Sequence, residues 1–172
     1  MSVVTSFGTN TLWLFALIRR VPWSIQRARR MLPARATTHY NRAMAITLSL
    51  KVLPPELSIV RRPSSAGIPW WAARSEAFLS FTRTSEETSL VCESRLIPEG
   101  VQAQRGYRAL RVDGPLPLDA TGILTSLAVP LADAGVPIFV IATFDTDYIL
   151  VPEARLGTAI EVLQGAGHAV TQ

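Results

Sequence analysis

Apolar and polar residues alternate along several stretches of the chain, as they do in half-buried β-strands. Single strands are predicted at residues 46–53, 57–61 and 107–113. Two hairpins are predicted, one from residues 77–82 and 89–92, the other from residues 138–144 and 148–151. The second hairpin is rich in β-branched and aromatic residues, and the turn Asp145-Thr146-Asp147 joins its strands.

Two segments have the three- and four-residue apolar spacing of helices. The first follows Asp119, which is the expected N-cap for the amides of Thr121 and Gly122, and it ends at Ala134-Gly135. Pro130 lies inside it and should bend it by removing one hydrogen bond. Its expected apolar face consists of Ile123, Leu124, Leu127, Ala128 and Leu131.

The second helix is predicted to begin at Pro152-Glu153, because proline is tolerated in a first turn. Gly165 and Gly167 should end it, before a last edge strand at residues 168–170. Its expected apolar face consists of Leu156, Ala159 or Ile160, and Leu163. One helical turn is predicted at residues 69–73, with its two tryptophans on different sides; such a pair closes a core more often than it lines a pocket.

The order strand, helix, strand, strand, helix, strand over residues 107–172 is the ferredoxin-like plan of an α+β fold, with helices on one face of an antiparallel sheet. Residues 46–106 fit a degenerate copy with short or missing helices. The two predicted hairpins also share a pattern, because Phe78 precedes Thr82 by four residues as Phe139 precedes Thr143. Leu90-Val-Cys-Glu93 matches Leu150-Val-Pro-Glu153 with a one-residue difference in spacing, which indicates an internal duplication.

The charge distribution separates residues 1–43 from the rest. The whole chain has a net charge of +4, but residues 1–43 contain seven arginines and no acidic residue, and the remainder is acidic overall. The apolar run at residues 12–18 is far shorter than the roughly 20 residues of a membrane span. We expect residues 1–43 to be a disordered basic extension or a transit-like leader, with a membrane-surface or nucleic-acid arm as a further alternative. The expected location is cytoplasmic, or mitochondrial if residues 1–43 act as a transit peptide.

Candidate catalytic chemistry is sparse. The single cysteine, Cys92, excludes an internal disulfide, suits a reducing compartment and is predicted to be a buried inert thiol. His39 and His168 lack metal-ligand spacing, and neither a phosphate-binding glycine loop nor a Gly-x-Ser-x-Gly elbow is present. The sequence therefore predicts no enzyme activity, metal or cofactor.

Residues Ala142-Thr-Phe-Asp-Thr-Asp-Tyr-Ile-Leu-Val151 resemble a segment that recurs in ACT domains, small regulatory modules that bind amino acids. The similarity is closest to the paired-ACT proteins that include the CASTOR arginine sensors. It covers most of residues 46–172 and none of residues 1–43. It implies a degenerate N-terminal module at 44–106 and a C-terminal module at 107–172.

The resemblance also implies a ligand site. In ACT domains the ligand commonly lies by the first strand–helix loop, against the second strand of a neighbouring module. Here that loop supplies the amides of Thr121, Gly122 and Ile123, which suit a carboxylate. The facing strand end supplies Thr143, Phe144 and Asp145, and the equivalent edge of the first module is Ser80 to Thr82. Ala142 stands where many relatives have serine, so one polar contact is lost.

The two turn aspartates, Asp145 and Asp147, have several possible roles. They can cap the turn, contact a ligand, act together as acid and base, or bind a metal ion. The expected function is that of a non-enzymatic regulatory protein that binds a small amino acid. A structural module that dimerises through its sheets without a metabolite, and a regulatory partner of an enzyme of amino-acid metabolism, are the alternatives. One sheet face, with Val140 and Ala142 among its apolar residues, lacks covering helices, so either the two modules pair within the chain or two chains pair. A homodimer is expected.

Overall fold

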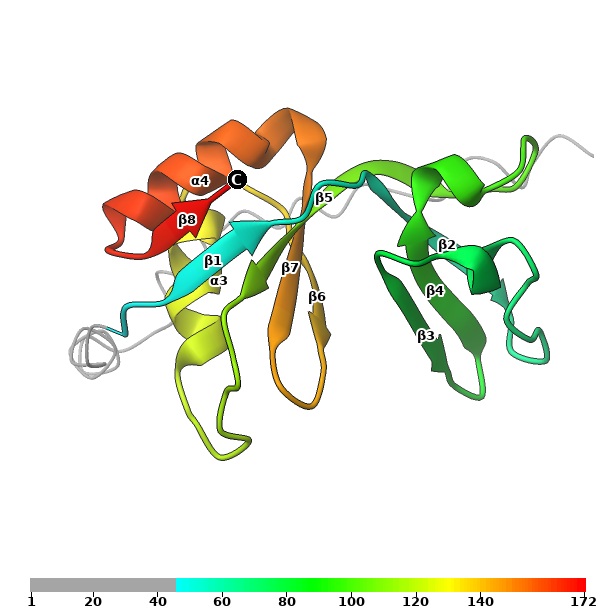
Figure 1. Ribbon diagram of the computed structural model, residues 1–172, viewed down its shortest axis with the longest axis horizontal. Helices are drawn as coiled ribbons and strands as arrows, with labels where there is room; N and C mark the ends of the chain where they lie inside the picture. The colour runs from blue at the N-terminus through cyan, green and yellow to red at the C-terminus, as the bar shows by residue number, and fades with distance from the viewer. Residues whose placement is uncertain (1–45) are drawn as a thin grey trace, which may run out of the picture. The chain divides into compact units, whose positions relative to one another are not determined.

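A computed structural model describes residues 46–172, so the extension predicted at residues 1–43 lies outside the described residues (Figure 1). The described residues contain eight strands of one sheet, two α-helices and three single 3-10 turns. The strands are β1 Ser49–Val52, β2 Leu57–Pro63, β3 Leu79–Arg83, β4 Glu87–Glu93, β5 Gln104–Val112, β6 Phe139–Ala142, β7 Asp147–Pro152 and β8 Ala169–Thr171. The helices are α3 Ile123–Asp133 and α4 Leu156–Gly165, and the 3-10 turns are Ala72–Arg74, Ser94–Leu96 and Glu153–Arg155.

Strand β5 connects two groups of strands. Its first residues pair with β2, at Leu57 with Tyr107 and Ile59 with Gln104, which gives the order β3-β4-β2-β5. Its later residues pair with β1 on one side and β7 on the other, which gives the order β6-β7-β5-β1-β8. Figure 1 shows β5 passing from the strands β2, β3 and β4 to the part of the chain with both helices.

The ferredoxin-like order predicted for residues 107–172 is confirmed, because β5, α3, β6, β7, α4 and β8 follow one another along the chain. In the preceding part the positions of the two helices are taken by the 3-10 turns Ala72–Arg74 and Ser94–Leu96. Sequence reasoning did not foresee the position of β1. This strand lies between β5 and β8, antiparallel to β5 and parallel to β8.

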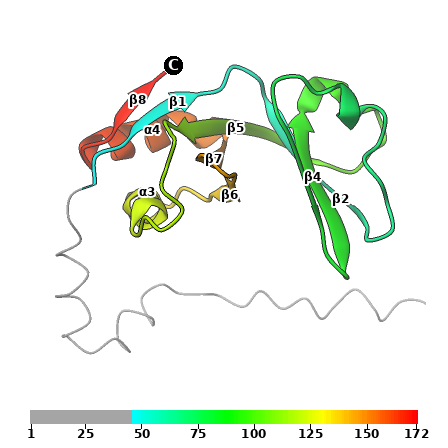
Figure 2. The ribbon, with the colours of Figure 1, turned by 60° about the horizontal axis from the view of Figure 1, so that its bottom comes forward.

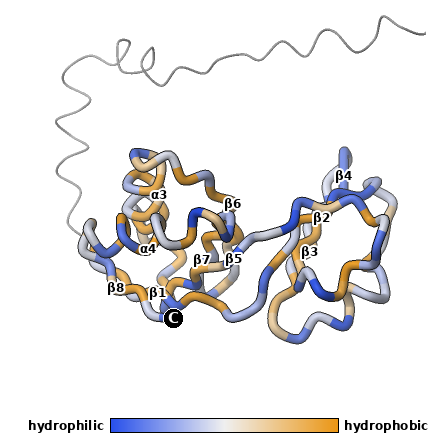
Figure 3. Tube along the Cα trace, turned by 90° about the horizontal axis from the view of Figure 1, so that it is seen from above, coloured by the Kyte–Doolittle hydropathy of each residue, from blue (hydrophilic) through white to orange (hydrophobic). Residues whose placement is uncertain are grey.

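Both α-helices pack on one face of the sheet, beside β1, β5 and β7 (Figure 2). Their buried side chains are Leu127, Leu131, Ala159 and Leu163, which contact Leu50, Val52, Leu110, Val112, Ile149 and Val151. The apolar residues of β7 are visible as an orange segment in Figure 3. Leu124 is an exception to the predicted face of α3, because it is 42% exposed.

The face without helices differs from the sequence expectation. Val140 packs against the cluster beneath the helices, so it does not belong to the other face. The opposite face carries Phe139, Ile141 and Tyr148, which pack with residues of the preceding strands, among them Leu57, Phe78 and Val91. Part of this face is therefore covered by the same chain, which was one of the two alternatives that the sequence left open.

The first group of strands has its own core. Trp71 is buried there with Val60, Leu90 and Cys92, whereas Trp70 is exposed, so the two tryptophans face different ways as predicted. Burial of Cys92 is likewise confirmed.

The predicted duplication has a more regular form in the structure than in the sequence comparison. In both hairpin turns a threonine amide donates to a carbonyl oxygen three residues later, Thr84 to Glu87 and Thr143 to Thr146, each at 2.8 Å. Each member of the second turn lies 59 positions after its counterpart, and so does the 3-10 turn Glu153–Arg155 after Ser94–Leu96. Thr143 therefore corresponds to Thr84 and not to Thr82, and the uneven spacing read from the sequence was wrong.

Candidate functional site

A pocket of about 280 Å³ lies where three segments meet: the loop after β5, the start of α3 and the β6–β7 turn. Gly122 and Ile123 line it from the helix start, and Thr143 and Asp147 line it from the hairpin. Apolar side chains surround it, among them Leu118 and Phe144, which are 75% and 77% exposed.

The loop before α3 is tied to the hairpin turn through backbone atoms. The amide of Leu116 donates to the carbonyl oxygen of Asp145 at 2.8 Å. Gly114 allows this approach, because a Cβ atom at that position would collide with the same carbonyl oxygen. Two walls of the pocket are therefore fixed relative to each other without side-chain contacts.

The hairpin turn is held by its threonines. The Thr143 hydroxyl donates to the carbonyl oxygen of Thr146 at 2.8 Å and accepts from the Thr146 amide at 3.3 Å. The Thr146 side chain is buried, and its hydroxyl donates to the carbonyl oxygen of Val112 in β5. These hydroxyls hold the turn, and Asp147 is the one acidic residue in the lining of the pocket.

The start of α3 corrects the sequence prediction. Gly122, not Asp119, is the N-cap, with a φ of 87° and no side-chain cap. Asp119 lies within a separate turn, in which the amide of Ala120 donates to the carbonyl oxygen of Pro117, and the left-handed residue Gly122 separates that turn from the helix. The first amides of α3 consequently have no intrahelical acceptor and remain available at the pocket wall.

Four of the eight predicted ligand residues lie together. Gly122, Ile123, Thr143 and Phe144 all line this pocket. Thr121 and Asp145 adjoin it in sequence but do not line it, and both are exposed.

Ser80 and Thr82 belong to another cavity, of about 320 Å³, which they share with residues Phe139 to Ala142 of β6. Ser80 also lines a third cavity, of about 330 Å³, together with Thr143. Thr82 therefore lies apart from the predicted residues at the start of α3, whereas Ser80 shares a cavity with Thr143.

Asp147 is the site residue that sequence reasoning did not select. It is half-buried and lies directly opposite Ala142 in the β6–β7 pairing. Salt bridges among residues 46–172 do not include it. Strand alternation could have identified Asp147 in the sequence, because Asp147 and Ile149 share a face of β7. Ile149 is buried beneath the helices, so Asp147 lies on the same side of the sheet as α3.

Within residues 46–172, no cluster of three or more histidine, cysteine or acidic side chains could hold a metal ion. Cys92 is remote from the pocket, and burial raises the pKa of its thiol to about 11. A thiol with this pKa is almost wholly protonated near neutral pH and is a poor nucleophile. In the same part of the chain, no helix is long and apolar enough to cross a membrane.

Comparison with known proteins agrees with this architecture. A family model described as an ACT domain matches residues 102–165, and a model of an N-terminal domain matches residues 56–100. A bovine protein named "Cytosolic arginine sensor for mTORC1 subunit 1" is 33% identical over 135 residues, or 77% of this chain. The match covers 39% of that relative, so the chain spans well under half the length of this curated relative.

Solved structures extend the comparison. A protein from Agrobacterium tumefaciens is 37% identical, with a TM-score of 0.69, and the match covers 73% of this chain and 93% of that one. An aspartate kinase from Clostridium acetobutylicum shares the fold at 12% identity and a TM-score of 0.52, over 67% of this chain and 34% of the kinase. With its ferredoxin-like order, its ACT domain match and these relatives, the chain belongs to the ACT domain family.

Proposed function

We propose that this chain is a non-enzymatic regulatory protein that binds a small amino acid in the pocket between α3 and the β6–β7 turn. The observation that carries the proposal is that opposite walls of one pocket offer helix-start amides and the carboxylate of Asp147. Free amides at a helix start bind an α-carboxylate, and a carboxylate binds an α-ammonium group. A zwitterion needs both at once.

The apolar lining constrains the rest of the ligand. Leu116, Leu124 and Phe144 line the pocket together with the polar groups. A volume of about 280 Å³ lies near the lower end of ligand pockets, which suits a ligand smaller than a drug molecule. The bovine relative is named as an arginine sensor, which supports an amino acid as the ligand class and a cytosolic location.

Dimerisation is part of the proposal. Leu118, Leu124 and Phe144 are exposed at the rim of the pocket, and a second copy could cover them and complete the site. In this arrangement Ser80 and Thr82, which line the second cavity, would contribute a separate edge of the assembly. Light scattering with and without ligand measures this step, and a monomer under both conditions would contradict it.

The alternatives make different predictions. A structural module that dimerises without a metabolite would show no response to any amino acid. A regulatory partner of an enzyme would co-purify with that enzyme. Thermal unfolding of the full chain in the presence of each of the twenty amino acids separates the sensor from the structural module, because a ligand at a hundred times its dissociation constant adds roughly 2.7 kcal/mol of stability.

A pair of neighbouring variants locates the site. Asp147→Asn removes the carboxylate from the pocket and should weaken binding at least roughly tenfold, as expected for a charge-assisted hydrogen bond. Asp145→Asn changes a side chain outside the lining and serves as the matched control. A loss in Asp145→Asn alone would place the ammonium at the outer turn, and no loss in either variant would exclude this pocket.

A further inference from the structure

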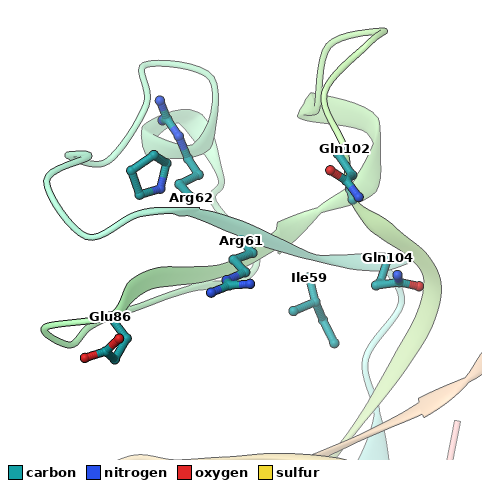
Figure 4. Close-up of a pocket in the computed structure, with 8 residues that line it drawn as sticks. Ile59, Arg61, Arg62, Glu86, Gln102 and Gln104 are labelled. Carbon is teal, nitrogen blue, oxygen red and sulfur yellow. The ribbon is translucent and has the colours of Figure 1, made fainter. Parts of the chain in front are cut away.

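A pocket of about 540 Å³ lies on β2 and shares no lining residue with the proposed amino-acid pocket. Figure 4 shows Arg61 and Arg62 on opposite sides of this strand, and the acidic residue Glu86 lines the same pocket. These charged groups therefore do not converge on one ligand. A buried histidine next to α3 has a better defined set of partners.

His168 lies between α4 and β8, and only 5% of it is exposed. The amide of Leu48 donates to its Nδ1 atom at 3.2 Å, and its Nε2 atom lies 3.2 Å from the carbonyl oxygen of Ser126 in the first turn of α3. An amide nitrogen donates and a carbonyl oxygen accepts, so Nδ1 carries no proton and Nε2 carries one. The two contacts therefore fix one neutral tautomer of the ring.

Ser126 connects this histidine to the wall of the proposed amino-acid pocket. The amide of Ser126 donates to the carbonyl oxygen of Gly122 at 2.9 Å, and its hydroxyl donates to the carbonyl oxygen of Ile123 at 2.7 Å. Gly122 and Ile123 both line the pocket. His168 is thus bonded to a residue that itself holds the two helix-start residues of the pocket.

The segment before β1 contacts the same wall. The carbonyl oxygen of Leu48 accepts from the amide of Ala169, the residue after His168, at 2.8 Å. Two residues before Leu48, the Cδ1 atom of Ile46 lies 3.2 Å from the position that a Cβ atom at Gly122 would occupy. The imidazole therefore holds both the first turn of α3 and the segment that packs against its N-cap.

A proton on Nδ1 of His168 is incompatible with this arrangement, because it would face the Leu48 amide and two donors cannot share a hydrogen bond. The elements that contact His168 carry three ionisable side chains, Lys51 on β1, Asp133 on α3 and Glu161 on α4. All three are exposed, and none of the salt bridges among residues 46–172 includes His168. A protonated ring would therefore lose one partner without gaining a carboxylate.

We infer that His168 is a positioning residue that couples the proposed amino-acid pocket to pH. The neutral ring holds the start of α3 against the segment before β1. Histidine gains its charge between about pH 8 and pH 5, and this charge removes the acceptor of the Leu48 amide and lets the helix start shift. An amino acid should then bind more weakly in acid. This effect on binding rests on the proposed function, whereas the shift of the helix start does not.

NMR of the ¹⁵N-labelled full chain without any ligand tests the shift of the helix start. As the pH falls from about 7.5 to about 5.5, we expect the amide signals of Leu48, Gly122 and Ile123 to move together. His168→Gln should abolish this common movement, because its side-chain amide does not titrate. The chain contains one other histidine, so His39→Gln is the matched control and should leave the movement unchanged.

A second measurement tests the effect on the pocket. The amino acid that stabilises the parent most in the screen of twenty is titrated at the same two pH values. Its affinity for the parent should fall roughly three- to tenfold in acid, as expected for the loss of one hydrogen bond. Its affinity for His168→Gln should not depend on pH. If His168→Gln does not fold, His168→Asn, whose side-chain oxygen can accept from the Leu48 amide, is the second variant.

The outcomes distinguish this inference from the proposed function. A common movement of the amides without stabilisation by any amino acid would contradict the proposed function and support the role of His168 at the helix start. Absence of movement at Leu48, the same movement in the His168 variant, or movement at Leu48 without movement at Gly122 and Ile123 would overturn the inference. Equal affinity of the parent at both pH values would overturn its coupling to the pocket.

Discussion

Phe78 and Tyr148 meet edge to face, with ring centroids 4.9 Å apart and an interplanar angle of 65°. Phe78 precedes β3, and Tyr148 follows Asp147 in β7. The contact therefore joins the first group of strands to the hairpin that forms the proposed amino-acid pocket.

Replacement of Phe78 should test how much this contact stabilises the fold. Phe78→Leu keeps an apolar side chain but removes the aromatic pair, so we expect the free energy of unfolding to fall by about 1–2 kcal/mol. Urea denaturation measures the loss. Leu79→Ala, at a neighbouring exposed residue, is the control and should change stability much less. Equal losses of unfolding free energy for the two variants would show that the ring pair does not stabilise the fold beyond ordinary apolar burial.

Two glycines should respond in opposite directions to the same substitution. Gly157→Ala lies in α4, where an added Cβ meets no atom within 4 Å, and should stabilise the protein by about 0.5–1 kcal/mol through helix propensity. Gly114→Ala would place a Cβ against the carbonyl oxygen of Asp145 and should destabilise the protein and disturb the pocket. Thermal unfolding of both variants checks this, and stabilisation by Gly114→Ala would mean that the loop moves aside freely.

The buried carboxylate of Glu93 should give the protein an acid-sensitive step. Burial raises the pKa of Glu93, but hydrogen bonds from the Ala77 amide, Arg95 and Ser75 outweigh this, so the pKa is lowered from 4.5. As the pH falls through 4.5, Glu93 takes up a proton in the unfolded chain before it does so in the folded chain. The stability that Glu93 contributes is therefore fully present above about pH 4.5 and is lost as the pH falls through the lowered pKa. Glu93→Gln should flatten the acid limb of a stability–pH curve. If Glu93→Gln loses stability in acid as steeply as the parent does, other carboxyl groups cause the acid-sensitive step.

Cys92 should act on the alkaline side. Burial raises its pKa from 9.0 to about 11, so the folded chain retains a proton that the unfolded chain loses between these values. Stability from this residue should fall by roughly 2–3 kcal/mol as the pH rises through that window. The difference between the parent and Cys92→Ala isolates the effect, because alanine does not titrate. Parallel curves for the two proteins would contradict the assignment.

Much of the fold was predictable because strand alternation and helix spacing are local properties of the chain. Both hairpins, both α-helices and the order from β5 to β8 follow from such patterns. The position of β1 was not predictable in this way, since its partners β5 and β8 lie more than fifty residues away. The helix start was misjudged because the backbone conformation of Gly122 outweighed the capping preference of Asp119.

Prediction of the site was limited in the same way, because local sequence patterns do not determine how distant segments pair. The family segment located the hairpin turn, and four of its implied residues line one pocket. Which of the two turn aspartates faces that pocket depends on the register of β7 with β6, where Asp147 pairs with Ala142. Register is a tertiary property, and a shift by one residue reverses the face of every side chain.

Strand β5 serves as the last strand of one ferredoxin-like order and the first strand of the next. Duplicated domains joined by a linker can be separated by cutting it, and each half can then evolve or unfold alone. Here the junction is itself a row of paired backbone groups, so a break within β5 would remove the hydrogen-bonding partner of β2 on one side and of β1 and β7 on the other. We therefore expect the two groups of strands to unfold together, in one cooperative step.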